Sequence, residues 1–436
     1  MQTNFSPAQL AKPATAASAA ELRKCVHCGF CLATCPTYTL LGDERDSPRG
    51  RIYLMKDMLE NDRAPSATVV KHVDRCLSCL SCMTTCPSGV NYMHLVDHAR
   101  AYIERHHRRP WGERLIRGVL AATLPYSGRF RAALRLARLA RPLAPLFART
   151  AALRPVAAML ALAPPRLPAR AGRPPSAAGR RGTVILLQGC VEPVLRPAIQ
   201  AATVRLLNRV GYAVHFASGE GCCGALVHHM GREEASLQAA RRNVDAWSRA
   251  LDDGDVAAIV MTSSGCGTAI KDYGFVLRKD PIYAERAERI ARLAKDISEI
   301  FADVEMPAGN GQGLTVAYHA ACSLQHGQKV TDIPKRLLAA AGFDVRTPAE
   351  AHLCCGSAGV YNILQSDIAD QLGRRKADCL ARLEPDVVAA GNIGCAVQIR
   401  QWSGIPAVHT VELLDWATGG PVPDDLSHLT NPGIPK

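Results

Sequence analysis

Two runs of cysteines with identical spacing stand in the N-terminal part of this 436-residue chain. In each run three cysteines are separated by two residues, a fourth follows after three more residues, and proline comes next. The runs are Cys25, Cys28, Cys31 and Cys35, and Cys76, Cys79, Cys82 and Cys86. Thiolates at this spacing can wrap one corner of an iron-sulfur cube, so the eight cysteines predict two [4Fe-4S] clusters.

Two other uses of these cysteines fit the spacing less well. Structural zinc usually takes two pairs of cysteines rather than three closely spaced ones with a Cys-Pro. A disulfide framework does not suit a large chain of a reducing compartment. In two-cluster ferredoxins the fourth cysteine of each run ligates the other cluster. This crossover assigns cluster I to Cys25, Cys28, Cys31 and Cys86, and cluster II to Cys76, Cys79, Cys82 and Cys35.

Eight further cysteines form a second pattern that occurs twice. In each repeat a single cysteine is followed 32 residues later by a Cys-Cys-Gly motif. A last cysteine follows the second cysteine of this motif, after 43 residues in the first repeat and 40 in the second. The repeats contain Cys190, Cys222, Cys223 and Cys266, and Cys322, Cys354, Cys355 and Cys395. Converging thiolates beside glycine suit a soft metal, so we treat these cysteines as a further cluster or redox site. The alternative is that they are buried free cysteines, as we expect for Cys379.

The elements around this second pattern alternate between strands and helices. Strands are predicted at 183–187, 212–217 and 256–261, and again at 314–318, 343–345 and 387–390. Helices are predicted at 198–210, 233–251, 333–341 and 367–383. This alternation is typical of parallel sheets, and ligands of such sheets bind at the carboxyl ends of the strands. The repeated cysteines should therefore gather in two crevices. The first cysteine module, in contrast, is expected to be helical, with helices at 49–60 and 92–105.

One segment carries the positive charge of the chain. Residues 105–181 hold seventeen arginines, no lysine and a single acid, Glu113, whereas the whole chain has a formal net charge of +13. Frequent prolines limit its helices to short pieces. It is either a solvated linker or scaffold, or a surface for an acidic partner subunit or anionic lipid. Nucleic acid is not expected as a partner, because no binding motif or aromatic platform is present.

Composition and the absence of other motifs limit the compartment and the kinds of site that the chain can have. Seventeen cysteines, an odd number, favour a reducing compartment. Neither a signal peptide nor an apolar run of transmembrane length is evident, so the chain is expected to be cytoplasmic, with peripheral contact on the inner face of the cytoplasmic membrane as one option. No Walker motif, nucleophile elbow, flavin site or nicotinamide site is recognisable. Residues 309–313 precede a strand and are expected to form a flexible loop.

The two patterns together resemble a known family. The motifs that carry the resemblance are Lys24-Cys25-Val26-His27-Cys28, Arg75-Cys76-Leu77-Ser78-Cys79, Tyr318-His319-Ala320-Ala321-Cys322 and His352-Leu353-Cys354-Cys355-Gly356. A duplicated Cys-Cys-Gly motif behind a two-cluster ferredoxin is similar to the CCG family of heterodisulfide reductase and of flavin dehydrogenase subunits. Over nearly the whole chain it most closely resembles the iron-sulfur subunits of bacterial glycolate oxidase, also called glycolate dehydrogenase.

This resemblance implies an α+β multidomain fold: a helical two-[4Fe-4S] ferredoxin-like domain followed by two repeated α/β CCG domains with parallel sheets. The expected segments are a loose tail at 1–20, the ferredoxin-type domain at 21–104, a basic helical linker at 105–181, and CCG domains at 182–306 and 307–436.

The resemblance also implies electron transfer. Partner FAD subunits would oxidise glycolate to glyoxylate, and this chain, with no catalytic residue, flavin or NAD of its own, would relay electrons towards a quinone or other membrane acceptor. The alternatives are a subunit of an anaerobic glycerol-3-phosphate or lactate dehydrogenase, and a heterodisulfide-reductase-like catalyst.

The chain departs from the heterodisulfide reductase pattern at one place in each repeat. In the heterodisulfide reductase pattern the motif ends in Cys-x-x-Cys. In this chain Ala269 stands at the last position of the first repeat and Gln398 at that of the second. This puts a pair of larger clusters in doubt and leaves room for a single cluster or none. His319, His326 and His352 could supply a ligand, but we expect a hydrogen-bonding or packing role for each.

Overall fold

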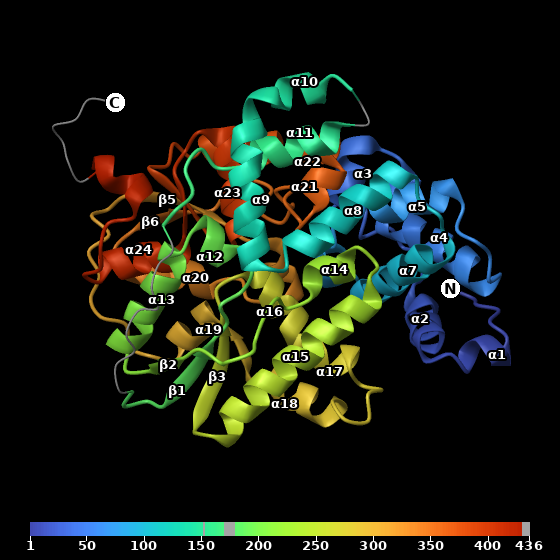
Figure 1. Ribbon diagram of the computed structural model, residues 1–436, viewed down its shortest axis with the longest axis horizontal. Helices are drawn as coiled ribbons and strands as arrows, with labels where there is room; N and C mark the ends of the chain where they lie inside the picture. The colour runs from blue at the N-terminus through green and yellow to red at the C-terminus, as the bar shows by residue number, and fades with distance from the viewer. Residues whose placement is uncertain (151–152, 170–178, 430–436) are drawn as a thin grey trace.

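The computed structural model describes residues 1–150, 153–169 and 179–429. Parts of the predicted basic linker, at 151–152 and 170–178, and the end of the second predicted CCG domain, at 430–436, lie outside the described residues. The helical cysteine module lies at one end of the molecule and the two sheets at the other (Figure 1). The linker helices run across the top of this view and connect the two ends.

The expectation of a loose N-terminal tail is wrong. Helices α1 (Pro7–Leu10) and α2 (Pro13–Lys24) cover most of residues 1–20. Alanine-rich α2 has high helix propensity, and its buried Ala19 and Leu22 pack in the core of the cysteine module. Ser18 Oγ lies 2.7 Å from His98 Nδ1, which fixes the helix to the module. The N-terminal residues are therefore an integral layer of the cysteine module.

The rest of the cysteine module is helical, as predicted. Its elements are α3 (Pro36–Leu41), η1 (Glu44–Asp46), α4 (Pro48–Glu60), α5 (Ala67–Asp74), α6 (Ser81–Thr85) and α7 (Tyr92–His106). Helices α4 and α7 confirm the predicted helices 49–60 and 92–105. Met55, Val73 and Leu95 are fully buried between these helices and form the module's core.

The linker forms short helices that bridge the other parts. They are α8 (Trp111–Thr123), α9 (Ser127–Ala140), η2 (Arg141–Leu143), α10 (Ala144–Ala148) and α11 (Arg154–Leu162). Leu120 of α8 is buried beside Val227 of the first repeat and Val360 of the second. Part of the linker is thus a packed layer, in agreement with the scaffold interpretation of the basic segment.

Each repeat contains a four-stranded parallel sheet. The strand orders are β2-β1-β3-β4 and β6-β5-β7-β8. The strands are β1 (Thr183–Leu186), β2 (Ala213–His215), β3 (Val256–Met261), β4 (Ala294–Asp296), β5 (Thr315–His319), β6 (Asp344–Arg346), β7 (Val387–Ala390) and β8 (Ala407–His409). The three predicted strands of each repeat are confirmed. The fourth strands, β4 and β8, were not predicted, because three residues give no readable alternation of apolar and polar side chains.

Helices cover both sheets. Those of the first repeat are α12 (Glu192–Leu195), α13 (Ala198–Arg209), α14 (Ala225–His229), α15 (Glu233–Asp252), α16 (Ser264–Lys271), α17 (Tyr273–Val276), α18 (Ala284–Leu293) and α19 (Ile297–Ala302). Those of the second are η4 (Ser323–Gly327), α20 (Ile333–Ala340), α21 (Tyr361–Leu364), α22 (Ser366–Ala381), α23 (Ile393–Ser403), α24 (Thr410–Ala417) and η5 (Asp424–Leu429). The predicted helices 198–210, 233–251, 333–341 and 367–383 are confirmed as α13, α15, α20 and α22.

The two repeats share one apolar core. Helix α13, the first long helix of the first repeat, packs on α24, the last α-helix of the second. Helix α20 of the second repeat packs in the same way on α19 of the first. The core includes Val184 and Val260 from one sheet and Val316 and Val387 from the other. This reciprocal packing makes the two sheets one body.

The segment at 309–313 is held tightly, although a flexible loop was expected. The backbone N–H of Asn310 donates to Ala417 O at 2.8 Å, and that of Gly311 donates to Ala341 O at 2.8 Å. A Cβ atom added to Gly309 would lie 2.7 Å from the Cα of Ala341. The glycines are therefore needed for close packing against the second repeat. Among the described residues, no helix is long and apolar enough to cross a membrane.

Replacing Asp415 tests the interface between the repeats. Its buried carboxylate on α24 accepts hydrogen bonds from Arg205 Nε at 2.8 Å and lies 2.7 Å from Arg209 Nη2, both on α13. Asp415→Ala is expected to lower the free energy of unfolding by about 1–3 kcal/mol, because charge-assisted hydrogen bonds are lost. Urea unfolding followed by circular dichroism measures the change.

Asp252→Ala is the control, since the exposed Asp252–Arg289 pair at 3.6 Å lies at the surface. Equal unfolding midpoints for both variants would show that the α13–α24 ion pairs do not stabilise the shared core.

Candidate functional site

The two cysteine runs adopt the same backbone conformation. The second and fourth residues after the first cysteine have positive φ angles: 58° at His27 and 86° at Gly29, and 51° at Ser78 and 63° at Leu80. Residues other than glycine adopt this left-handed region only where the surrounding structure requires it. Both runs therefore form the same tight loop.

These loops and the helices beside them bring the cysteines to two adjoining cavities. One cavity is lined by Cys25, Cys28, Cys31, Cys82 and Cys86. The other is lined by Cys35, Cys76, Cys79 and Cys82. Cys82 thus lines both cavities, and the other seven cysteines divide as the crossover requires. The assignment of these cysteines as ligands stays a prediction.

The two cavities differ in exposure. Beside the first, Cys28 is exposed, and so are Val26 and Phe30. The cysteines around the second are all buried. Burial raises the pKa values of the Cys79 and Cys82 thiols, and nearby cysteines, including Cys322 for Cys79, raise them further.

A buried arginine organises the second cavity. Arg51, only 1% exposed, donates from Nε to His72 O at 2.6 Å and from Nη2 to Thr37 Oγ1 at 3.0 Å. Its Nη1 lies 3.8 Å from Cys35 Sγ. Nη2 also pairs with the fully buried Asp46 at 3.3 Å. Burial alone would lower the pKa of Arg51, but the surrounding acidic groups, led by Cys76, raise it. This network was not predicted, because Arg51 looks in the sequence like one more polar residue of a helix.

In the repeats, the structure brings together all four cysteines of each set. Cys322 Sγ lies 3.7 Å from Cys354 Sγ. Hydrogen bonds from Cys190 and Cys223 lower the pKa of Cys222 to about 3. Cys355 has a similarly lowered pKa, owing to hydrogen bonds with Cys354 and Cys395 and to His319.

The glycines after the paired cysteines allow a left-handed turn and close packing of the backbone. Gly224 and Gly356 both have a φ angle of 88°. An added Cβ would lie 3.1 Å from Ser236 O in the first case and 2.6 Å from Ala369 O in the second. Cys379 lies apart from both thiol sets on α22, with its Sγ 3.8 Å from Glu350 Oε2. It is a buried free cysteine.

The loop of the second cysteine run lies between the two repeats. Cys79 shares a hydrophobic cluster with Cys354, and Cys322 packs against that cluster. On the other side, Ser78 and Leu80 line a small cavity together with Cys223. The loop is anchored by a hydrogen bond from Tyr361 Oη to Arg75 O at 2.9 Å. One cysteine loop therefore connects the helical module with both sets of repeat thiols.

The three nearby histidines have different surroundings. His326 bonds through Nδ1 to Thr84 Oγ1 at 2.8 Å and through Nε2 to His352 O at 3.1 Å, which is the hydrogen-bonding role expected for it. His352 is partly exposed, and burial lowers its pKa. His319 is 1% exposed, and neither ring nitrogen has a hydrogen-bond partner among the described residues. Of the two roles expected for His319, hydrogen bonding or packing, only packing agrees with these surroundings.

A polar network between the helical module and the first repeat was not predicted. The buried Asp97 of α7 lies 3.3 Å from His228 Nε2 and 3.6 Å from His229 Nδ1. Burial would raise the pKa of Asp97, but the two histidines hold it well below the usual range. The His228–His229 pair beside Cys223 was visible in the sequence. Its partner lies more than a hundred residues earlier, so only the fold reveals the network.

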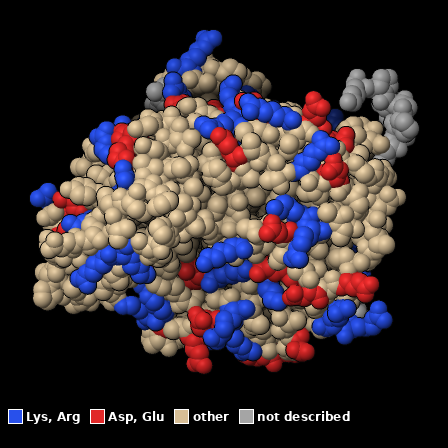
Figure 2. All heavy atoms as spheres, turned by 180° about the vertical axis from the view of Figure 1, so that it is seen from behind, with Lys and Arg blue, Asp and Glu red and all other residues tan. Residues whose placement is uncertain are grey.

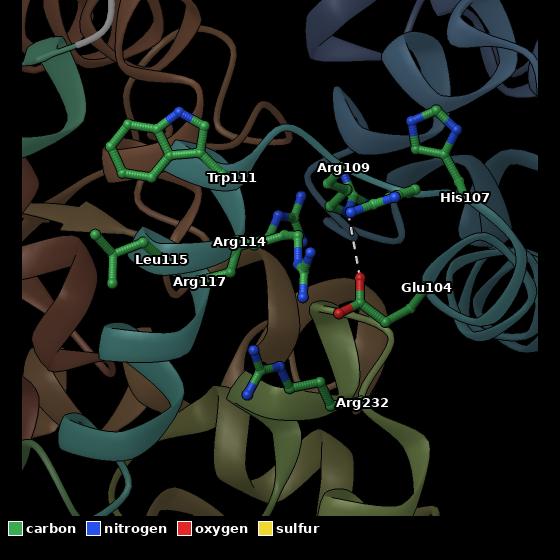
Figure 3. Close-up of a pocket in the computed structure, with 9 residues that line it drawn as sticks. Glu104, His107, Arg109, Trp111, Arg114, Leu115, Arg117 and Arg232 are labelled. Atoms are coloured by element: carbon green, nitrogen blue, oxygen red, sulfur yellow. Dashed lines mark hydrogen bonds and ion pairs between the residues drawn. The ribbon is translucent and has the colours of Figure 1, made fainter.

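A large cavity lies away from the cysteines. It is an open basin of about 990 Å³ between the end of α7, helix α8 and the start of α15. Arg114, Arg117 and Arg232 project into it, and Trp111 and Leu115 lie along one side (Figure 3).

The cations of this basin fall into two groups. Arg109 and Arg117 form ion pairs with Asp74 and Glu113 at 2.6–3.2 Å. Arg108, Arg114 and Arg232 have no carboxylate at ion-pair distance among the residues that the structure describes. The basin is therefore a cationic surface next to exposed apolar side chains.

Replacing Arg51 tests its influence on the second cavity. Arg51→Met keeps an apolar stem but removes a buried positive charge and leaves Asp46 less well paired, which is expected to cost about 3–5 kcal/mol of stability. Loss of a cation beside a cluster also disfavours its reduced form, so one of the cluster midpoint potentials should become more negative. Urea unfolding and EPR-monitored redox titration measure the two effects.

Arg45→Ala is the matched control, because Arg45 pairs at the surface with Asp43 at 2.9 Å. If Arg51→Met and Arg45→Ala have the same stability and potentials, the buried network has no influence on the second cavity.

Comparisons with known proteins agree with this architecture. A model of the 4Fe-4S dicluster domain matches residues 21–90, and a model of the cysteine-rich CCG domain matches residues 184–271 and 316–400. Among solved structures, a hypothetical protein from Helicobacter pylori is similar, with a TM-score of 0.54 over 88% of this chain and 70% of that one. At 10% identity this likeness concerns the fold alone.

Similarity to curated proteins extends over the whole chain. The chain is 28% identical to lactate utilization protein A of Bacillus licheniformis over 240 residues, and the matched region covers 53% of this chain and 98% of that one. It is 31% identical to the probable glycolate oxidase iron-sulfur subunit of Bacillus subtilis, over 92% of this chain and 94% of that one. Identity to the glycolate oxidase iron-sulfur subunit of Escherichia coli is 40%, over 91% of this chain and 94% of that one. Together with the dicluster domain and both CCG regions, this coverage shows that the chain belongs to the family of glycolate oxidase iron-sulfur subunits.

Proposed function

We propose that this chain relays electrons within a glycolate oxidase complex. Its partner subunits carry FAD and oxidise glycolate to glyoxylate, a step that releases two electrons and two protons. The chain passes the electrons on one at a time towards a quinone or another membrane acceptor. The observation that carries this proposal is the grouping of eight cysteines around two adjoining cavities. The family membership supplies the substrate and the kind of partner.

We further propose two [4Fe-4S] clusters with crossed ligands. Cluster I would be held by Cys25, Cys28, Cys31 and Cys86, and cluster II by Cys76, Cys79, Cys82 and Cys35. The donor set fits, because each cavity is lined by at least four thiols, contributed by two loops of the same conformation. When bound, such clusters supply reversible one-electron chemistry. The residues themselves hold and tune them, and no acid or base of this chain takes part in substrate oxidation.

The difference in exposure suggests a direction for the relay. Cys28 is exposed beside Val26 and Phe30, two apolar side chains that are 66% and 64% exposed. Exposed apolar side chains beside a redox site suit contact with a partner subunit. Cys79, in contrast, faces the repeats. Electrons would therefore enter at cluster I and leave past cluster II.

Cluster content and activity test this function. The isolated chain, purified without oxygen, is expected to contain about eight iron atoms in ferredoxin-type clusters and to show no glycolate oxidation without its flavin partner. Cys35→Ser should remove about half of that iron and the EPR signal of one cluster. Cys379→Ser is the control and should keep the full content, because Cys379 lies outside both cavities. Flavin-free glycolate oxidation by the isolated chain would contradict the proposal.

We also propose that the linker contacts anionic lipid. Helix α8 presents Trp111 and Leu115 on one exposed stripe, and Leu139 on α9 is 81% exposed. Arg108, Arg114 and Arg232 line the adjoining basin. Apolar side chains beside unpaired arginines are typical of helices that lie in a membrane interface. On the face opposite to that of Figure 1, basic and acidic side chains are interspersed, so charge alone does not make that face a lipid surface (Figure 2).

Vesicle sedimentation tests this lipid contact. The full chain should sediment with vesicles that contain phosphatidylglycerol and less with zwitterionic vesicles alone. Trp111→Glu combined with Arg114→Glu should abolish that difference. Ile282→Glu is the matched control, since Ile282 is an exposed apolar residue of the first repeat. Equal sedimentation of the two variants would contradict the proposal, and would leave an acidic subunit as the occupant of this surface.

A further inference from the structure

His319 is a buried histidine with no partner for either of its ring nitrogens. It ends strand β5, is 1% exposed, and neither Nδ1 nor Nε2 has a hydrogen-bond partner among the described residues. Buried polar groups without a partner are rare, because they lose their hydrogen bonds to water and gain nothing in return. A neutral imidazole presents one nitrogen lone pair, and that lone pair is also a common ligand for metals.

The thiols around His319 have metal-binding geometry. One of its nitrogens, Cys355 Sγ and Cys395 Sγ all lie within 4.8 Å of one another. Cys354 follows in the same motif, and its Sγ is 3.7 Å from Cys322 Sγ. Four thiols and one imidazole therefore converge at the carboxyl ends of β5 and β7. The buried ammonium group of Lys376 adds a positive charge that acts on Cys355 and Cys354.

The first repeat lacks this fifth donor. Three residues before its first cysteine stands Leu187, where the second repeat has His319 three residues before Cys322. Leu187 is buried in the hydrophobic cluster that also contains Cys223. The first repeat thus offers four thiols beside a hydrocarbon side chain, and the second offers four thiols beside an imidazole.

Gln398, which stands where the heterodisulfide reductase pattern has its last cysteine, is not a substitute ligand. Its Nε2 donates to Ala369 O at 3.1 Å, and its Oε1 accepts from Asn362 Nδ2 at 3.2 Å. Both polar atoms of this side chain are therefore occupied within the protein. The extra donor of the second repeat comes from strand β5.

We propose that the second repeat holds a soft-metal centre with His319 as one of its ligands, and that the first repeat has no such centre. Thiolate and imidazole together suit zinc, and also iron in a cluster with mixed sulfur and nitrogen ligation. Cys79 and Cys354 lie in one hydrophobic cluster, so this centre is next to cluster II. The use of this metal centre as the next electron carrier after cluster II rests on the proposed function. The existence of the centre does not.

Metal analysis of the full chain tests the proposal. Iron, zinc and acid-labile sulfide are measured on wild type, His319→Leu, His319→Cys and His352→Leu. Two cubane clusters account for about eight iron atoms, and wild type is expected to hold additional metal. This additional metal is either further iron with sulfide or about one zinc ion. His319→Leu copies the residue of the first repeat and should lose only this additional metal. His319→Cys should keep the metal and change its EPR or X-ray absorption spectrum, because nitrogen is replaced by sulfur.

The variants carry their own controls. His352→Leu removes a neighbouring imidazole and should keep the additional metal. Retention of the ferredoxin-type iron in His319→Leu shows that the chain is folded. Wild type with no metal beyond the two clusters would overturn the proposal, and so would His319→Leu with unchanged metal and spectrum. Absence of the cluster iron from wild type would instead contradict the proposed relay, so the two failures are distinguishable.

Discussion

The apolar core that the two sheets share is the constraint on which the rest of the structure depends. Helices α13 and α24 pack across it, and α20 and α19 repeat the contact. Because the sheets are parallel and joined in this reciprocal way, the carboxyl ends of their strands meet around the loop of the second cysteine run. Neither repeat could position its thiols against that loop alone. The duplication that looks like two domains in the sequence is one body in the fold.

The charges of the molecule follow from the same arrangement. Negatively charged thiolate sites need compensating cations, and the structure supplies these inside the protein, with Arg51 at the second cavity and Lys376 near Cys354 and Cys355. The arginines of the linker are divided between two uses. Arg109 and Arg117 neutralise Asp74 within the packed layer, whereas Arg114 and Arg232 face open space. The packed arginines agree with the scaffold interpretation of the basic segment, and the contact surface stays a proposal.

Local spacing made most of the fold predictable. The cysteine runs, the 32-residue interval and the strand–helix alternation are all short-range patterns, and they correctly indicated a helical module and two parallel sheets. The predictions that failed concern features that depend on residues distant in the sequence. Residues 1–20 looked like a tail because the contacts of Ala19 and Leu22 are with helices much later in the chain. Asp97 and His228, which contact each other, are also far apart in sequence. For His319, the sequence does not show that both ring nitrogens lack a hydrogen-bond partner among the described residues.

The position of the second cysteine loop has a consequence for biosynthesis. Cys79 is covered by Cys322, Cys354 and their neighbours, which are synthesised well after it. A hydrogen bond from Tyr361 to Arg75 O fixes this cover. Iron and sulfide for the proposed cluster II must therefore arrive before the C-terminal repeat docks, or must enter a form in which that repeat is displaced. The proposed cluster I, with Cys28 at the surface, is not covered in this way.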